Sequence, residues 1–167
     1  MPAEHLNAGS SPVAYFMKIA IVGHEAAKFT LEMAQKANDI IAGLIGHLMD
    51  PDDFVVSGHC HLGGIDIWAE EMATQLGIGK MIFPPAKLEW SGGYRERNIQ
   101  IAKACDVIHN IVVAEYPPNY KGMVFKGCYH CVKRPNRSHG EHIKSGGCWT
   151  AWLAHEKFGK PAYWHII

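Results

Sequence analysis

Residues 55–70 constrain the fold most. They form a short apolar run, then a turn rich in glycine, and then apolar residues again at helical spacing. Val55, Val56 and Ser57 predict the end of a buried strand, and the glycines after them allow the backbone to turn tightly and to approach a ligand closely. The helix that follows presents N–H groups that are unpaired and carry partial positive charge. This strand, loop and helix start therefore suit a phosphate or a nucleotide.

The alternation of apolar strand and amphipathic helix continues along the chain. Strands are expected at 18–23, 54–57, 80–83, 107–113 and 161–167, and helices at 30–49, 65–76, 94–104 and 147–158. Strands that alternate with helices form a parallel sheet with both faces covered. We therefore expect an α/β fold, a Rossmann-like parallel sheet sandwiched by helices.

Length and charge limit the domain count and the partners. A chain of 167 residues is the usual size of one domain, expected at 17–167 after an N-terminal extension at 1–16. Sixteen basic and sixteen acidic residues cancel, which gives no global attraction to nucleic acid or to an anionic membrane. No apolar run reaches the ~18 residues that span a bilayer, and the extension does not resemble a signal peptide. The sequence therefore indicates a cytoplasmic protein.

An irregular stretch at about 114–145, rich in Pro, Gly, Tyr, Cys and His, interrupts the pattern and is too long for an ordinary connection. It contains a Cys-x2-Cys pair followed by a His-x2-His pair, formed by Cys128, Cys131, His139 and His142. Two thiolates and two imidazoles at this spacing close a tetrahedron around zinc. We expect an inserted loop held by one structural zinc, whose binding free energy replaces a core.

Other interpretations of this loop stay open. Cys148 or His130 can replace one of the four ligands, or the cysteines are reduced and carry no metal. His139 and His142 can also belong to the edge of a pocket, where they touch the ligand directly.

Ligands of such a fold bind at the carboxyl ends of the strands. Four loops there carry glycine, hydroxyl or charged groups, and one glycine loop alone is most simply a tight turn. Four loops at one edge predict a site. The candidate ligand-binding residues are Gly23, His24, Glu25 and Lys28; Ser57, Gly58, His59, Gly63, Gly64 and Asp66; Arg95, Arg97 and Asn98; and Ser145, Gly146, Gly147 and Thr150.

The order of these motifs resembles the SLOG superfamily of Rossmann-like proteins. That group includes the DNA-processing protein DprA, the "lonely guy" phosphoribohydrolases and nucleotide-sensing domains of bacteria and phages. The resemblance runs from Lys18 to about Ile167, apart from the Cys/His insertion, and implies a pocket for a nucleotide-like ligand. The motifs that carry it are Val55-Val56-Ser57-Gly58, Gly64-Ile65-Asp66 with Ala69-Glu70, Arg95-Glu96-Arg97-Asn98, and Ser145-Gly146-Gly147 with Thr150 and Ala154.

The chain departs from the phosphoribohydrolases in their Pro-Gly-Gly-x-Gly-Thr-x-x-Glu pattern. Trp149 stands in place of a glycine, and Leu153 stands where the catalytic carboxylate falls. Glycosidic cleavage needs such a carboxylate to stabilise an oxocarbenium-like centre. The sequence leaves three substitutes open: Glu25, Glu70 and Glu71.

Several residues have two possible roles. Arg97 contacts phosphate or fixes a loop, Asn98 contacts ligand or pairs with backbone, and Asp66 accepts a ribose hydroxyl or caps a helix. His59 and His61 are expected to line the pocket as neutral groups, with Cys60 packed behind them. Trp90 is the tryptophan expected to stack on a base.

These observations favour a protein that binds a nucleotide or a nucleotide derivative. The alternatives are an N-glycosidase that acts on a nucleotide and a DprA-like module for single-stranded DNA, which the neutral charge balance disfavours. We expect a homo-oligomer with no membrane partner, and an apolar helix face formed by Trp149, Trp152 and Leu153 is a candidate dimer surface.

Overall fold

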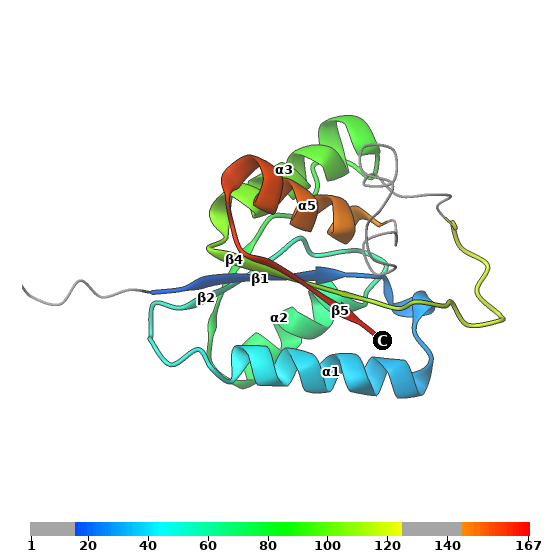
Figure 1. Cartoon of the computed structure of the whole chain (residues 1–167), viewed down its shortest axis with the longest axis horizontal. Coiled ribbons are helices and arrows are strands. Elements are labelled where there is room, and N and C mark those ends of the chain that lie inside the picture. The colour runs from blue at the N-terminus through cyan, green and yellow to red at the C-terminus, as the bar shows by residue number, and fades with distance from the viewer. Residues whose placement is uncertain (1–15, 125–144) are drawn as a thin grey trace, which may run out of the picture.

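A five-stranded parallel sheet forms the centre of the computed structural model, which describes residues 16–124 and 145–167 (Figure 1). The strands are β1 (Lys18–Gly23), β2 (Phe54–Ser57), β3 (Gly79–Ile82), β4 (Val107–Val112) and β5 (Ala162–Ile166). Their order is β3-β2-β1-β4-β5, and every neighbouring pair is parallel. The expected α/β, Rossmann-like fold is confirmed.

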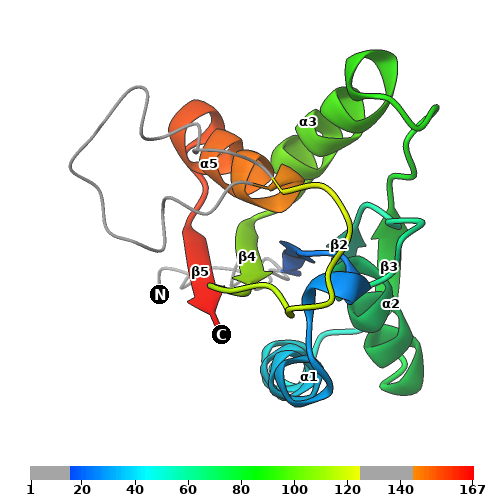
Figure 2. The same cartoon turned by 90° about the vertical axis from the view of Figure 1, so that its right-hand side faces the viewer.

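Helices cover both faces of this sheet. α1 (Leu31–Ile45) and α2 (Ile65–Gln75) lie on one face, and α3 (Arg95–Ala104) and α5 (Gly146–Phe158) lie on the other (Figures 1 and 2). A short 3-10 turn, η1 (Ala26–Lys28), precedes α1, and a π turn, η2 (Trp90–Tyr94), precedes α3. The sheet is thus the middle of three layers.

Two apolar clusters hold the layers together. Ile21 of β1 packs toward α1 and α2 with Ile41 and Ile65, whereas the preceding residue, Ala20, packs toward α3 and α5 with Ile101. Successive strand residues point to opposite faces, and both faces are covered. This explains why the central strand is an unbroken apolar run rather than an alternating one.

Side-chain caps set the starts of two helices. Thr30 Oγ1 accepts the N–H of Met33 at 3.2 Å, which places the first residue of α1 at Leu31. Ser145 Oγ accepts the N–H of Cys148 at 3.1 Å in the same way at the start of α5. Such caps satisfy backbone donors that a helix leaves unpaired.

The ends of the expected elements shift by a few residues. The first helix, expected to reach residue 49, ends at Ile45. The helix expected at 94–104 is preceded by the η2 turn, in which Gly92 adopts a φ of 76°, a conformation that favours glycine. α5 packs its Leu153 into the apolar cluster beside α3, and Trp149 and Trp152 pack against the same cluster.

No helix within residues 16–124 and 145–167 combines the length and the apolar character needed to cross a membrane. Residues 1–15 of the expected extension lie outside the part of the chain that the structure describes.

The strand order reverses direction between β1 and β4. From β1 the chain proceeds to β2 and β3 on one side, and from β4 it proceeds to β5 on the other. In open α/β sheets this reversal leaves a crevice at the carboxyl ends of the two strands, where ligands bind. Figure 2 looks onto these ends, and the N-terminus of α5 lies over them.

Candidate functional site

The floor of the site is the place where α5 begins above β1 and β4. A Cβ at Gly147 would lie 2.9 Å from the backbone nitrogen of Gly23 and 2.8 Å from Asn110 Oδ1, so only glycine allows this approach. A cavity of about 700 Å³ opens above the floor. We call it the α5 lobe.

Most of the candidate residues from the four loops line the α5 lobe. They are Gly23, His24, Glu25, Lys28, Asp66, Arg97, Asn98, Ser145, Gly146, Gly147 and Thr150. The structure therefore brings the loops after β1, β2 and β4 together with the start of α3. The residues that it does not place in this lining are Ser57, Gly58, His59, Gly63, Gly64 and Arg95.

Three of the residues outside the lining hold the β2–α2 loop in shape. Ser57 Oγ donates to Glu70 Oε1 at 2.7 Å, and His59 Nδ1 lies 2.7 Å from Glu70 Oε2. The carbonyl of Gly58 accepts a hydrogen bond from Arg97 Nη1. Ser57 is buried and needs a hydrogen-bond partner, so its contact, like those of His59 and the Gly58 carbonyl, serves the loop itself.

The other three residues outside the lining have a conformational or surface role. Gly63 and Gly64 adopt φ values of 73° and 88°, and a Cβ at Gly64 would collide with the carbonyl oxygen of His24. Arg95 is exposed and pairs with Glu96 at 3.3 Å.

Arg97 orients the amide of Asn98. Arg97 Nε donates to Asn98 Oδ1 at 2.7 Å, so the amide oxygen faces the guanidinium and Nδ2 faces the other way. Nδ2 is buried and has no hydrogen-bond partner among the described residues. It lies 3.5 Å from the position that a Cβ at Gly146 would occupy. A buried donor thus points at the start of α5.

Lys28 and His24 form the wall on the β1 side. Burial lowers the pKa of Lys28, whose ammonium lies 5.1 Å from the centre of the Tyr116 ring. His24 Nδ1 accepts the N–H of Val113 at 3.2 Å. Burial, helped by the charge of Lys28, lowers the pKa of His24 to about 3. The neutral ring therefore carries its proton on Nε2, which has no partner among the described residues.

Asp66 is buried in the first turn of α2, two residues after the N-cap Gly64. Its Oδ2 lies 3.8 Å from Arg97 Nη1. Burial raises the pKa of Asp66 to about 6, and the nearby guanidinium opposes this shift. Asp66 is thus not the capping residue of α2, and its carboxyl group lines the cavity.

Aromatic rings line the α3 side of the α5 lobe. Trp90 packs edge-to-face on Trp149, with ring centres 5.1 Å apart, and His61 stacks on Tyr94 at 6.4 Å. The sequence pointed to Trp90 but not to Tyr94, because a tyrosine at a helix start carries no sign of a ligand site. Cys60, which was expected to pack behind the histidines, lines the cavity, while His59 is exposed outside it.

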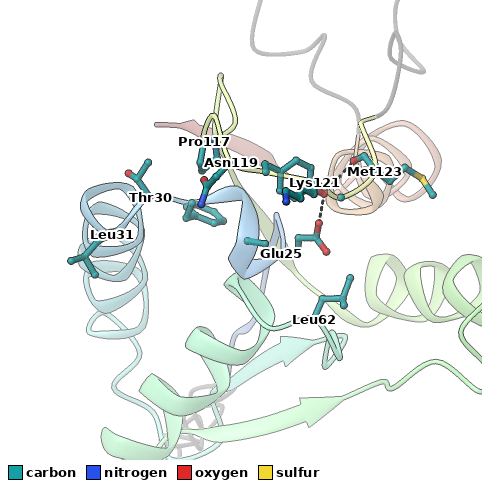
Figure 3. A pocket seen from close by; sticks show the side chains of 12 residues that line it. Glu25, Thr30, Leu31, Leu62, Pro117, Asn119, Lys121 and Met123 are labelled. Atoms are coloured by element: carbon teal, nitrogen blue, oxygen red, sulfur yellow. Dashed lines mark hydrogen bonds between the residues drawn. The ribbon is translucent and has the colours of Figure 1, made fainter.

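A second cavity of about 860 Å³ adjoins the first on the side of α1 (Figure 3). We call it the α1 lobe. Glu25, Leu62 and Met123 line both lobes, so the two form one cleft across the strand ends. Tyr120 Oη donates a hydrogen bond to Glu25 Oε1 at the boundary. The sequence did not indicate Tyr120, because its contact with Glu25 joins two loops 95 residues apart.

The four predicted zinc ligands lie outside the described residues. Within residues 16–124 and 145–167, no three metal-ligating side chains form a group. Cys148 is buried, and its Sγ accepts a hydrogen bond from Asn110 Nδ2 at 3.1 Å. The buried thiol of Cys105 packs in the apolar cluster beside α3.

No known family model matches this chain, and no curated protein matches it significantly.

Proposed function

We propose that this protein binds a nucleotide or a nucleotide derivative and holds its phosphate at the start of α5. The observation that carries the proposal is the buried, unpartnered Nδ2 of Asn98 beside Gly146. Leaving a buried donor unpaired costs about 1–3 kcal/mol, so a ligand that accepts its hydrogen bond recovers this cost. A phosphate oxygen is such an acceptor.

The electrostatics at the start of α5 favour an anion. α5 is thirteen residues long, and its N-terminus carries the positive end of the helix dipole. Ser145 caps the N–H of Cys148, while Gly146 and Gly147 line the cavity with no side chain in the way. Backbone N–H groups at a helix start bind phosphate readily. Lys28 adds a cation to the same cavity.

The remaining walls suit the rest of a nucleotide. Trp90 and Tyr94 offer aromatic rings to a base, and the Asp66 carboxyl group can accept from sugar hydroxyls. The SLOG resemblance points to the same ligand class through the order of the four loops. We also propose, from the sequence, a cytoplasmic location and a homo-oligomeric state.

A second candidate function is N-glycosidic cleavage of the bound nucleotide. Of the three carboxylates that the sequence left open, Glu25 lines the cavity, Glu70 binds Ser57 and His59, and Glu71 is exposed. Glu25 is therefore the residue on which cleavage would depend.

Titration calorimetry with AMP and with adenosine tests the binding proposal. The Asn98→Asp variant keeps the oxygen that accepts from Arg97 and replaces the Nδ2 donor by a second oxygen, which repels phosphate. We expect this variant to lose AMP binding, whereas Gln35→Glu, an equal charge change at an exposed site on α1, keeps it. Adenosine that binds as tightly as AMP, or an Asn98→Asp variant that binds AMP normally, would contradict the proposal.

A further inference from the structure

The cleft at the strand ends is larger than one nucleotide needs. Its two lobes measure about 700 and about 860 Å³, and each alone has the volume of a complete small-molecule site, roughly 300–1,000 Å³. The lobes share three wall residues: Glu25, Leu62 and Met123. A mononucleotide in the α5 lobe therefore leaves the α1 lobe empty.

The α1 lobe has the chemistry of a ring site rather than of a second phosphate site. Phe29, Pro117 and Tyr120 give it an apolar and aromatic wall, and the amide of Asn119 provides a donor and an acceptor. Its one cationic wall residue among the described residues, Lys121, is exposed. An uncharged heterocycle with polar edges fits this lining.

Glu25 separates the two lobes by charge. Its carboxylate disfavours a phosphate at the boundary and accepts hydrogen bonds from sugar hydroxyls. Tyr120 Oη donates a hydrogen bond to Oε1, and Oε2 is the second oxygen of this carboxylate that can accept. The boundary therefore suits a ribose that links a phosphate in the α5 lobe to a ring in the α1 lobe.

The anion site lies in the middle of the cleft. Figure 2 shows η2 and α1 on opposite sides of the strand ends, with the N-terminus of α5 between them. The aromatic residues Trp90 and Tyr94 belong to η2, and Phe29 and Tyr120 line the lobe beside α1. Aromatic surfaces thus flank one positive centre on both sides.

We propose that the cleft binds a dinucleotide, that is, two nucleoside groups joined through phosphate. The phosphates lie at the start of α5, one base lies beside Trp90, and the second base lies in the α1 lobe beyond Glu25. This inference rests on the proposed nucleotide binding. It adds that the ligand carries a nucleoside group on each side of its phosphates.

Titration calorimetry with AMP, NAD⁺ and diadenosine diphosphate tests the inference. We expect both dinucleotides to bind at least about tenfold more tightly than AMP, because they fill both lobes. The Asn119→Trp variant places a ring in the α1 lobe and should weaken both dinucleotides to the level of AMP, with AMP binding unchanged. Asn119 is exposed, so the substitution is compatible with folding.

The control is Glu115→Trp, an exposed position in the same loop that lines neither lobe. If Asn119→Trp melts early, Lys121→Trp at another exposed wall position replaces it. AMP binding as tightly as the dinucleotides, or equal losses for all three ligands in Asn119→Trp, would overturn the two-lobe inference and leave nucleotide binding standing. If none of the three ligands binds, both proposals fail.

Discussion

Arg97 Nε donates a hydrogen bond to Asn98 Oδ1 across 2.7 Å, and this one contact decides which way the amide of Asn98 points. The same guanidinium binds the Gly58 carbonyl and lies 5.4 Å from the centre of the Tyr94 ring. Arg97 thus joins the β2–α2 loop to α3 and, through Asn98, orients a donor of the proposed phosphate site. These contacts show Arg97 as a loop anchor, one of the two roles that the sequence left open, and its contact with phosphate stays a prediction.

Arg97→Lys should weaken AMP binding about tenfold with a smaller effect on folding. An ammonium cannot reproduce the fixed fork that binds Asn98 and Gly58 together, and one orienting hydrogen bond contributes roughly 0.5–1.5 kcal/mol. Calorimetry measures the affinity, and thermal melting follows the fold. Arg95→Lys, at an exposed neighbour, is the control. Unchanged affinity in Arg97→Lys would show that Asn98 needs no orienting partner.

Gly146→Ala should separate stability from binding. Alanine is favoured over glycine within a helix by roughly 0.5–1 kcal/mol, and a Cβ at this position meets only Asn98 Nδ2, at 3.5 Å. The melting temperature should therefore rise or stay the same, while the new methyl group covers the Asn98 donor and weakens AMP binding. A variant that binds AMP as tightly as the parent would place the phosphate elsewhere.

His24 should make the fold sensitive to acid. Its pKa is lowered from 6.5 to about 3, so its contribution to stability is present above pH 6.5 and is lost as the pH falls toward 3. The free energy of unfolding should fall by an amount on the order of a few kcal/mol over this range. His24→Asn keeps an acceptor for the Val113 N–H and should flatten the pH profile of the unfolding free energy.

The flattening should be partial, because burial also lowers the pKa of His109 to about 4 and lowers that of His165. Urea denaturation at several pH values measures the profile, and the exposed His47→Asn is the control. An identical slope in His24→Asn and the parent would contradict the buried neutral imidazole.

Nucleoside monophosphates should bind without release of free base. Leu153 stands where the phosphoribohydrolases carry their catalytic carboxylate, and it is buried in the apolar cluster. Chromatography of the incubated nucleotide measures base release, while a thermal shift reports binding, worth about 2.7 kcal/mol at a ligand concentration of ~100 Kd. If base is released, Glu25→Gln should abolish the release and Glu71→Gln should not.

One zinc per chain is expected from Cys128, Cys131, His139 and His142. Elemental analysis of protein prepared without chelator should find it, and Cys128→Ser should lose it. Cys148→Ala should keep the metal, because that thiol is buried and bonded to Asn110. Stoichiometric zinc in Cys128→Ser would exclude the predicted ligand set.

The sequence predicted the elements of the fold well because each has a local cause. β1 is an apolar run that ends at Gly23, and α1 begins after the capping Thr30. The meeting of the four loops at one edge was predicted as well, since the strand order alone brings most of them there.

The finer roles in the site depend on which polar groups meet after folding. Ser57 was a candidate ligand contact, but Glu70 on the next helix accepts its hydroxyl. Tyr94 stacks on His61 of the β2–α2 loop, and Tyr120 donates a hydrogen bond to Glu25 of the β1–α1 loop. Both contacts join segments far apart in the sequence, which no local pattern records.

The floor of the cleft is made largely of backbone, from Gly23, Gly146 and Gly147, whereas its rim carries the exposed side chains of Trp90, Asn119 and Met123. A side chain at Gly147 pushes α5 off the sheet, and one at Gly23 collides with the backbone of Ile111 in β4, but substitution at the rim disturbs little else. The rim positions of the cleft thus tolerate substitution better than the floor positions do, both in evolution and in protein engineering. The backbone floor, where we propose that phosphate binds, is fixed by the packing of the fold, whereas the rim side chains that would select the rest of the ligand are free to change.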